Sequence, residues 1–364
     1  MIPISRPTFG PEEEQAVLEV MRSGQFAQGE RVRAFEKAFA SATGAQAAVA
    51  ASSGSAALLL ALLAHGVGRG DEVITSPLTF IATANAIVQT GATPVFADVD
   101  DSLDLSVTAV ARLIGPRTRA VMPVHLHGNP CDLPGLARLA ARNGLAVIQD
   151  ACQAVGAAVD GRPLGSYGTA AYSFYATKNL TPGEGGMVTT NDRRVAELCA
   201  KLRHQGYTDS SYIHDRMGYN FRMTELQAAI GLVQLGTLAS ITARRRQIGS
   251  YYDEAIAAER FGRPRTGSGA VHVYHQYTLR VPSSDGDGTA GRERDELREA
   301  LARVRVATGV YYPVPVHHQP AYADYRATRC PLAERASADM FSIPVHHALS
   351  DAEVETVATQ VSRL

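Results

Sequence analysis

Short apolar runs alternate with amphipathic segments along roughly the first half of the chain. Several of these runs are apolar at every position and not only at alternate ones. Such runs are typical of strands in a parallel sheet that helices cover on both faces. We predict strands at 47–51, 72–76, 94–98, 119–124, 145–149, 171–174 and 186–190.

Helical patterns lie between these strands, and the alternation indicates a layered α/β domain. After about residue 190 the pattern becomes mainly helical, and strand-like runs return only beyond Pro264. We therefore predict a large domain at 1–244 and a small α+β domain at 245–364. The predicted helices are 55–64, 79–89, 107–114, 133–142, 196–205, 223–235, 238–259 and 292–304, with late strand-like runs at 271–281 and 309–316.

Composition excludes several classes of protein. The 364 residues carry 35 Lys and Arg against 36 Asp and Glu, for a formal charge of −1. This balance disfavours the basic face that nucleic acid requires. The apolar stretches at 56–64 and 73–88 are shorter than the roughly 20 residues of a membrane span, and the N-terminus lacks the pattern of a signal peptide. We expect a cytoplasmic protein that binds neither nucleic acid nor membrane.

Cysteines, histidines and one arginine run give no metal or redox motif. The four cysteines form no CxxC pair, so we expect reduced, structural thiols. The eleven histidines match no compact metal template, and we predict no metal site. The arginine run 244–246 is expected on a solvated or ion-paired helix face. The cysteines are Cys131, Cys152, Cys199 and Cys330.

The first candidate site is the segment SSGS at 52–55, between a predicted strand and an Ala/Leu helix. Glycine allows close backbone approach, and a helix N-terminus offers free N–H groups and a positive dipole end. Ser53, Ser55 and the Ala56 amide are therefore candidates to hold a phosphate. A plain serine cap of the helix is the alternative.

Asp150 follows the apolar strand at 145–149. In open α/β sheets, ligands bind at the carboxyl ends of strands. A carboxylate buried there needs a cation, and a protonated pyridine nitrogen would serve. The alternative is that Asp150 caps a following helix.

Lys178 follows the strand that runs into Ser173, in a turn of Thr, Asn and Gly residues. Desolvation beside a ligand pocket lowers the pKa of a lysine and favours imine chemistry. An ordinary surface lysine is the alternative. A phosphate turn, an aspartate and a lysine at successive strand ends together supply what pyridoxal 5'-phosphate (PLP) requires.

The segments SSGSAALLLAL, VIQDACQAVGA, SFYATKNLTPGEGGMVTTND, GYNFRMTELQAAIGLVQL and YYPVPVHHQPAY extend this pattern over nearly the whole chain. The sequence resembles the DegT/DnrJ/EryC1/StrS family of PLP-dependent sugar aminotransferases. That resemblance implies the three-layer fold-type I architecture, with a mostly parallel seven-stranded sheet and a small C-terminal α+β domain.

The resemblance also implies roles for individual residues. Lys178 resembles the Schiff-base lysine and Asp150 the partner of the pyridine nitrogen; Gln153 would contact the ring hydroxyl and Phe80 would stack on the ring. His317 resembles a position near the substrate mouth. The residues implied around the phosphate are Ser53, Gly54, Ser55, Ala56 and Ser173.

Asn220 and Arg222 resemble residues that reach the phosphate of the neighbouring subunit's cofactor, so the resemblance implies a homodimer with active sites at the interface. Two departures keep hydrogen-bonding ability: Gln149 stands where many relatives have Glu, and Ser55 where Thr is common.

The implied reaction transfers an amino group from L-glutamate to a nucleotide-linked keto-deoxysugar. A keto-cyclitol is the alternative substrate. A sugar dehydratase of this fold would have histidine in place of Lys178. A non-catalytic PLP-binding regulatory protein is disfavoured, because the catalytic set is intact and no DNA-binding appendage or basic arm is present.

Overall fold

The computed structural model describes residues 1–207, 212–282 and 289–364. A seven-stranded sheet forms its centre, in the order β1-β9-β8-β5-β4-β2-β3. Strand β9 is antiparallel to both of its neighbours, and the other four pairings are parallel. The predicted mostly parallel sheet is confirmed. Its strands are β1 Ala47–Ala51, β2 Glu72–Thr75, β3 Thr93–Phe96, β4 Thr118–Met122, β5 Ala146–Asp150, β8 Thr169–Ser173 and β9 Gly186–Thr190.

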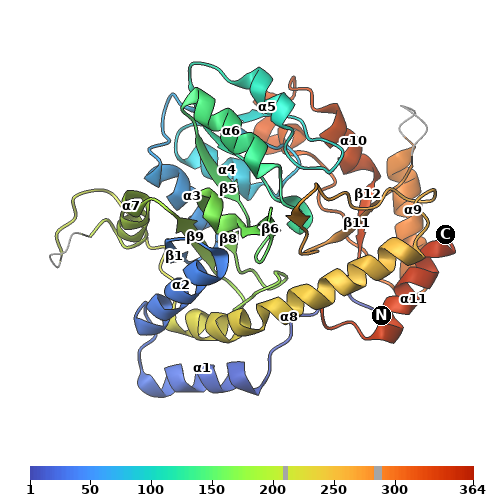
Figure 1. Ribbon diagram of the computed structural model, residues 1–364, viewed down its shortest axis with the longest axis horizontal. Coiled ribbons are helices and arrows are strands. Elements are labelled where there is room, and N and C mark those ends of the chain that lie inside the picture. Colours follow the sequence, from blue (N-terminus) through green and yellow to red (C-terminus); the bar gives the residue numbers. More distant parts are fainter. Residues whose placement is uncertain (208–211, 283–288) are drawn as a thin grey trace.

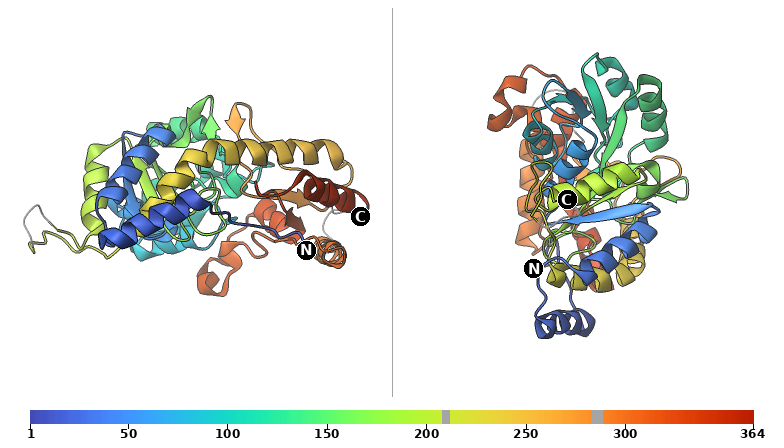
Figure 2. Two further views of the ribbon diagram at one scale, coloured as in Figure 1. Left: turned by 90° about the horizontal axis from the view of Figure 1, so that it is seen from below. Right: turned by 90° about the vertical axis from the view of Figure 1, so that its left-hand side faces the viewer.

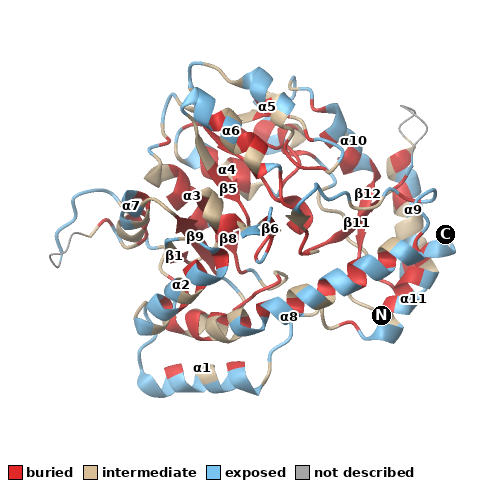
Figure 3. Ribbon diagram, in the orientation of Figure 1, coloured by how far each residue is buried: buried red, intermediate tan, exposed pale blue. Residues whose placement is uncertain are grey.

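Helices cover both faces of this sheet and make three layers (Figures 1 and 3). Alternate residues of the strands enter different apolar clusters: Val73, Ala120 and Met122 pack with α3 on one face, and Ile74 and Val121 pack with α6 on the other. Burial on both faces explains why these strands are apolar throughout. The helices of this part are α1 Pro11–Ser23, α2 Glu30–Thr43, α3 Gly54–Ala64, α4 Ala82–Gln89, α5 Val107–Leu113, α6 Leu133–Asn143 and α7 Arg193–Arg203, with short helices η1 Leu126–Gly128 and η2 Leu164–Tyr167.

One 31-residue helix, α8 (Glu225–Ala255), runs from α1 and α2 to the C-terminal part of the chain (Figure 1). Thr224 and Gln227 form a capping box at its start, which is a strong helix-initiation signal. The sequence pattern predicted two helices here, and the structure joins them. The predicted domain boundary at 244/245 therefore falls inside α8.

The arginine run on α8 divides between solvent and interior. Arg244 pairs with Asp351, as predicted for an ion-paired face. Arg245 is only 4% exposed and donates to the carbonyl of Tyr274, so the solvated prediction is wrong for this residue. Consecutive helix positions point in different directions, and a run of arginines cannot share one face.

Helix α8 is also the one described helix that is long and apolar enough to cross a membrane by length and composition. Only 33% of its most apolar window is buried within the chain. Its polar residue Gln234 is buried and donates to Glu13 of α1. The helix packs on α1 and α2, as a structural helix of a globular domain does.

The C-terminal part pairs β11 with β12 in an antiparallel ribbon beside three helices. The predicted strand at 309–316 is wrong beyond the bridge at Gly309, because Pro313 and Pro315 lack the N–H that a ladder requires. The predicted strand at 271–281 splits into β10 and β11. Elements here are β10 Ala270–Val271, β11 Tyr277–Arg280, α9 Ala290–Arg303, η3 Val316–His318, η4 Pro320–Tyr325, α10 Pro331–Asp339, β12 Met340–Ile343 and α11 Asp351–Ser362; β10 pairs with the hairpin of β6 (Ala158–Val159) and β7 (Arg162–Pro163).

The N-terminal residues lie against this C-terminal part and not against the sheet. Ile2 forms a bridge with Val306, and Arg6 pairs with Glu353 of α11 at 2.8 Å. Helix α1 then lies at the edge of the molecule (Figures 1 and 2). The chain ends thus meet while α1 projects from the body.

Candidate active site

The carboxyl ends of the central strands open into a cavity of about 590 Å³. Parallel strands place their carboxyl ends at one edge, so residues far apart in sequence meet there. The predicted site residues that line it are Ser53, Gly54, Ser55, Phe80, Asp150, Gln153, Ser173 and Lys178. Four predicted residues do not line it, namely Ala56, Asn220, Arg222 and His317.

The SSGS turn forms one end of the cavity. Ser53 is the N-cap of α3 and accepts a hydrogen bond from the Ala56 amide at 3.2 Å, so the alternative of a serine cap is confirmed. The cap does not exclude anion binding, because the Gly54 and Ser55 amides have no intrahelical acceptor. A Cβ on Gly54 would lie 2.6 Å from Ser173 Cβ. Close packing therefore requires glycine at the point where an anion would sit.

Asp150 is 5% exposed and ends β5 at the cavity wall. Its Oδ2 accepts from Thr83 Oγ1 at 2.7 Å, and its Oδ1 from the Cys152 amide at 3.1 Å. No helix follows it, so the helix-cap alternative is wrong. Among the described residues Asp150 has no ion-pair partner. A buried carboxylate without a cationic partner is suited to pair with a protonated ring nitrogen of a ligand.

Lys178 lies in the loop between β8 and β9. Its amide donates to the Tyr175 carbonyl at 2.8 Å, and Asn179 anchors the loop by donating to the Val273 carbonyl. Burial lowers the pKa of the Lys178 amine, and the negative charge of Asp150 acts in the opposite direction. Within the described part of the chain this amine makes no hydrogen bond. It is therefore available for covalent and proton-transfer chemistry.

Gln153 and Phe80 also belong to the wall of the cavity. Gln153 Oε1 accepts from the His127 amide at 2.7 Å, and its Nε2 donates to Tyr312 Oη at 3.1 Å. The Phe80 ring is 55% exposed and lies 5.9 Å from the ring of Tyr312. A flat ligand between Asp150 and Lys178 has Phe80 available as a stacking surface.

Four buried histidines surround this wall without adding charge. Burial lowers the pKa of His125 and His127 to about 4, and that of His272 to about 3. The pKa of His275 is lowered well below its usual value, first by burial and then by the positive charge of Lys178. These imidazoles are neutral at pH 7. Besides histidine, the Asp, Glu and Lys side chains that line the cavity are Asp150, Glu184 and Lys178.

The structure adds residues that the sequence reasoning did not single out. The hydroxyl groups of Thr79 and Thr83 are hydrogen-bonded to each other at 2.7 Å, and the Thr83 hydroxyl also donates a hydrogen bond to Asp150. Two threonines spaced four apart at a helix start share a face, which is a signal that the sequence offered. Tyr312 and His275 had no comparable signal, because distant segments bring them to the cavity.

Asn220 and Arg222 lie away from this cavity. Arg222 lines a separate surface pocket with His204 and Tyr207, and it contacts His204 Nδ1 at 2.9 Å. Asn220 is exposed. Within one chain neither residue lines the cavity that holds Lys178.

His317 and Cys152 also differ from expectation. His317 is fully buried against Phe96 and Glu334 and does not face the cavity. All four cysteines are free, as predicted, but Cys152 lines the cavity instead of packing only in the core. Burial and the charge of Asp150 raise the pKa of its thiol, which makes it a poor nucleophile.

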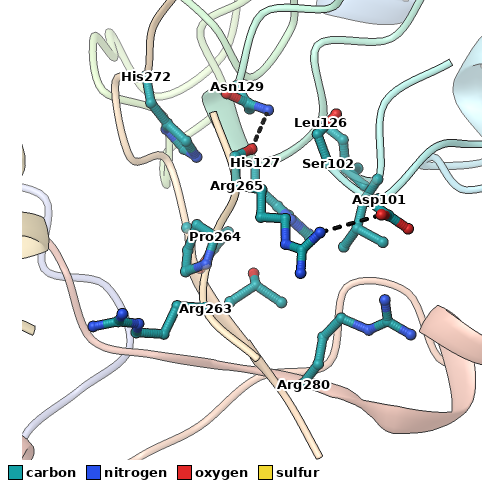
Figure 4. Close-up of a pocket in the computed structure, with 13 residues that line it drawn as sticks. Asp101, Ser102, Leu126, His127, Asn129, Arg263, Pro264, Arg265, His272 and Arg280 are labelled. Carbon is teal, nitrogen blue, oxygen red and sulfur yellow. Dashed lines mark hydrogen bonds and ion pairs between the residues drawn. The ribbon is translucent and has the colours of Figure 1, made fainter. Parts of the chain in front are cut away.

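A second, small cavity lies beyond His127, against the C-terminal part (Figure 4). Its volume is about 30 Å³, which suits a single water molecule. Arg265 pairs there with Asp101 at 3.1 Å, and Arg280 pairs with Asp339 at 2.6 Å. Its size and satisfied charges exclude it as a cofactor site.

Comparison with known proteins identifies a family for this chain. The DegT/DnrJ/EryC1/StrS aminotransferase family model matches residues 7–362. A "pleiotropic regulatory protein" of Geobacillus stearothermophilus is 39% identical, with 97% of this chain and 94% of that protein covered. A "UDP-N-acetyl-3-dehydro-alpha-D-glucosamine 3-aminotransferase" of Acidithiobacillus ferrooxidans is 36% identical, covering 98% and 96%.

Solved structures share the whole fold. DesV of S. venezuelae, solved with a ketimine intermediate, has a TM-score of 0.91 and 37% identity, covering 97% of this chain and 94% of that one. The PLP form of the putative sugar aminotransferase Spr1654 of Streptococcus pneumoniae has a TM-score of 0.92 and 28% identity, covering 100% and 98%. The protein is a PLP-dependent aminotransferase, and the chain belongs to the DegT/DnrJ/EryC1/StrS family.

Proposed function

We propose that this enzyme transfers an amino group from L-glutamate to the keto carbon of a nucleotide-linked deoxysugar. One observation carries the proposal: a single cavity holds a buried carboxylate and a lysine amine, and among the described residues the carboxylate has no cationic partner and the amine no hydrogen bond. Both groups fit PLP, which withdraws electrons from the substrate carbon when bound. The proposed cofactor contacts are Lys178, Asp150, Gln153, Phe80, Ser173 and the turn Ser53, Gly54, Ser55 and Ala56.

Each residue of the inner cavity has a physical task in this proposal. Asp150, held by Thr83, keeps the ring nitrogen protonated. Lys178 Nζ would hold the cofactor as an imine and, once the amino donor has displaced it, its free amine would serve as the base that carries the donor's α-proton. A lowered pKa leaves more of this amine unprotonated and able to act as a base.

A sugar substrate is supported by the relatives and by the wall of the cavity. The Acidithiobacillus relative is named for a UDP-linked 3-dehydro sugar. Here the aromatic side chain of Tyr175 lines the cavity at 47% exposure, in addition to Phe80, which is proposed to stack on the cofactor. Exposed aromatic rings suit the apolar face of a sugar ring. By the same reasoning a keto-cyclitol is the second candidate.

We also propose a homodimer in which Asn220 and Arg222 serve the partner's site. A phosphate needs cationic or N–H partners, and no arginine is among the described residues that line the cavity. Only a third of the most apolar window of α8 is buried within one chain. Large apolar side chains are exposed nearby at Phe9, Leu18, Met21 and Phe26, and again at Tyr212, Ile213 and Met217. A second copy would bury them.

A cytoplasmic location stays a prediction from the sequence.

The test is a two-step half-reaction. Purified protein loaded with PLP should show the visible absorbance of lysine-bound cofactor, lose it with L-glutamate, and regain it with one member of a panel of nucleotide keto sugars and keto-cyclitols. Lys178→Ala should lose both the initial absorbance and turnover. The chain has three lysines, and exposed Lys37 on α2 gives the matched control Lys37→Ala.

Four outcomes would contradict the proposal or one part of it. A protein that stays colourless with PLP would refute the cofactor assignment to Lys178. Bound PLP that does not respond to glutamate would favour the non-catalytic alternative. Recovery of absorbance with keto-cyclitols alone would move the substrate to that class. Light scattering that shows an active monomer would refute the role of Arg222 across subunits.

A further inference from the structure

Three metal-binding side chains meet outside the cavity. His317 and His318 belong to η3, and Glu334 lies in the first turn of α10. Each offers one ligand atom, and these atoms all lie within 4.8 Å of one another. None of the three residues lines the active-site cavity. The cluster is therefore separate from the proposed chemistry of Lys178.

The spacing suits a tetrahedral ion. His317 Nε2 lies 3.3 Å from Glu334 Oε1, and His318 Nε2 lies 4.0 Å from the same oxygen. Ligands at about 2.0–2.1 Å from a tetrahedral zinc are roughly 3.3 Å apart. The first pair already has this separation. The second needs a small movement of His318, whose side chain is 38% exposed and whose ring lies 4.1 Å from that of His317.

We propose that His317, His318 and Glu334 bind one Zn²⁺ ion, with water as the fourth ligand. Two imidazoles and one carboxylate form a donor set that suits zinc, whereas Ca²⁺ and Mg²⁺ prefer oxygen ligands. The open side at His318 gives the ion a path from solvent.

The surrounding contacts hold two of the ligands in place. Glu334 Oε1 also accepts from the Cys330 amide at 2.9 Å, which fixes the carboxylate at the start of α10. His317 is fully buried. Zinc displaces the proton on the His317 ring nitrogen that faces Glu334, and the proton moves to Nδ1. Among the described residues Nδ1 has no partner. This buried N–H costs free energy, so we expect moderate affinity.

Zinc at this position would restrain the segment around η3, which is connected to residues of the active-site cavity. The Val316 amide donates to the Pro77 carbonyl at 2.8 Å, three residues before Phe80. Tyr312, which contacts Gln153, lies just upstream of η3. A metal ion that joins η3 to α10 would stabilise both the Val316–Pro77 hydrogen bond and the position of Tyr312. The expected effect is higher thermal stability of the zinc-bound protein.

The experiment uses full-length, tag-free protein loaded with PLP and freed of metal by a chelator that is then removed. Zn²⁺ is titrated in competition with a chromophoric chelator, and Co²⁺ is added to a second sample. We expect one ion per chain, the visible bands of four-coordinate Co²⁺, and a higher melting temperature with zinc. His318→Leu and Glu334→Gln should each weaken binding at least about tenfold.

Controls separate this site from other histidines and from misfolding. His214→Leu removes another exposed histidine and should bind zinc as wild type does. Glu334→Gln keeps an acceptor for the Cys330 amide, and exposed His318 tolerates leucine without loss of core packing. Wild-type protein that binds no zinc would refute the proposal. Unchanged affinity in both the His318 and Glu334 variants would refute it equally, whatever the outcome of the half-reaction.

Discussion

Gly186 determines where the proposed phosphate-binding turn can lie. It begins β9 and pairs with Ala51 on one side and Ser173 on the other. An added Cβ would lie 2.2 Å from Ser53 O and 2.9 Å from Gly54 N, whereas ordinary contacts lie at 3.4–4 Å. Gly186→Ala therefore forces a displacement of at least about 1 Å. Because strands on both sides hold β9, we expect the turn at Ser53 to move.

The size of the effect follows from this displacement. Overpacking costs about 1–3 kcal/mol of stability. A hydrogen bond to a charged group contributes about 1.5–3 kcal/mol. Loss of the equivalent of one amide–phosphate bond, about 2 kcal/mol, weakens PLP binding roughly 30-fold. Lys178 is untouched, so saturating PLP should still give the absorbance of lysine-bound cofactor.

Titration of cofactor-free protein with PLP, followed by fluorescence and visible absorbance, measures this change. Gly115→Ala is the matched control, because an added Cβ there meets nothing within 4 Å. Circular dichroism and thermal melting establish that both variants fold. A folded Gly186→Ala variant with wild-type affinity for PLP would show that the turn does not hold the phosphate.

Three further predictions concern neighbouring groups. Thr83→Val removes the 2.7 Å hydrogen bond to Asp150, and we expect kcat/KM to fall about ten- to a hundredfold, with Thr83→Ser restoring most of it; unchanged kinetics would contradict the positioning role. We expect Lys178→Ala and Arg222→Ala protein each to be inactive alone. Mixed in equal amounts and allowed to exchange subunits, the two variants should recover about a quarter of wild-type activity. The reason is that half of the dimers are then mixed, and each mixed dimer has one complete active site of its two. No recovery in verified mixed dimers would place Arg222 in its own subunit's chemistry. Burial lowers the pKa of His125 and His127 to about 4, whereas an unfolded histidine titrates near 6.5. Between these two pH values the unfolded state binds more protons than the native state, so the free energy of unfolding should fall as the pH drops through this range. At pH 5 the expected loss is roughly 2 kcal/mol for each of these histidines. Urea unfolding at pH 7.5 and 5 tests this, and equal values at both would contradict it.

Local patterns in the sequence predicted the strands of the central sheet. The seven strands were predicted because burial on both faces leaves a continuous apolar run that is visible in the sequence. Elements of the C-terminal part were predicted less well. Residues 309–316 look strand-like by composition, but Pro313 and Pro315 remove the donors that a strand needs. Strand β12 had no such signal in the pattern and forms through its pairing with β11.

The sequence by itself determined the order of the candidate groups along the chain: a glycine turn, a carboxylate and a lysine, each at the end of a strand or in the loop that follows it. Those positions are local, because the chain must turn where a strand ends. Only the tertiary structure decided which groups share the cavity, since that depends on contacts between distant segments. It brought Thr83 and Tyr312 to the site, kept Arg222 outside it, and turned His317 away toward Glu334.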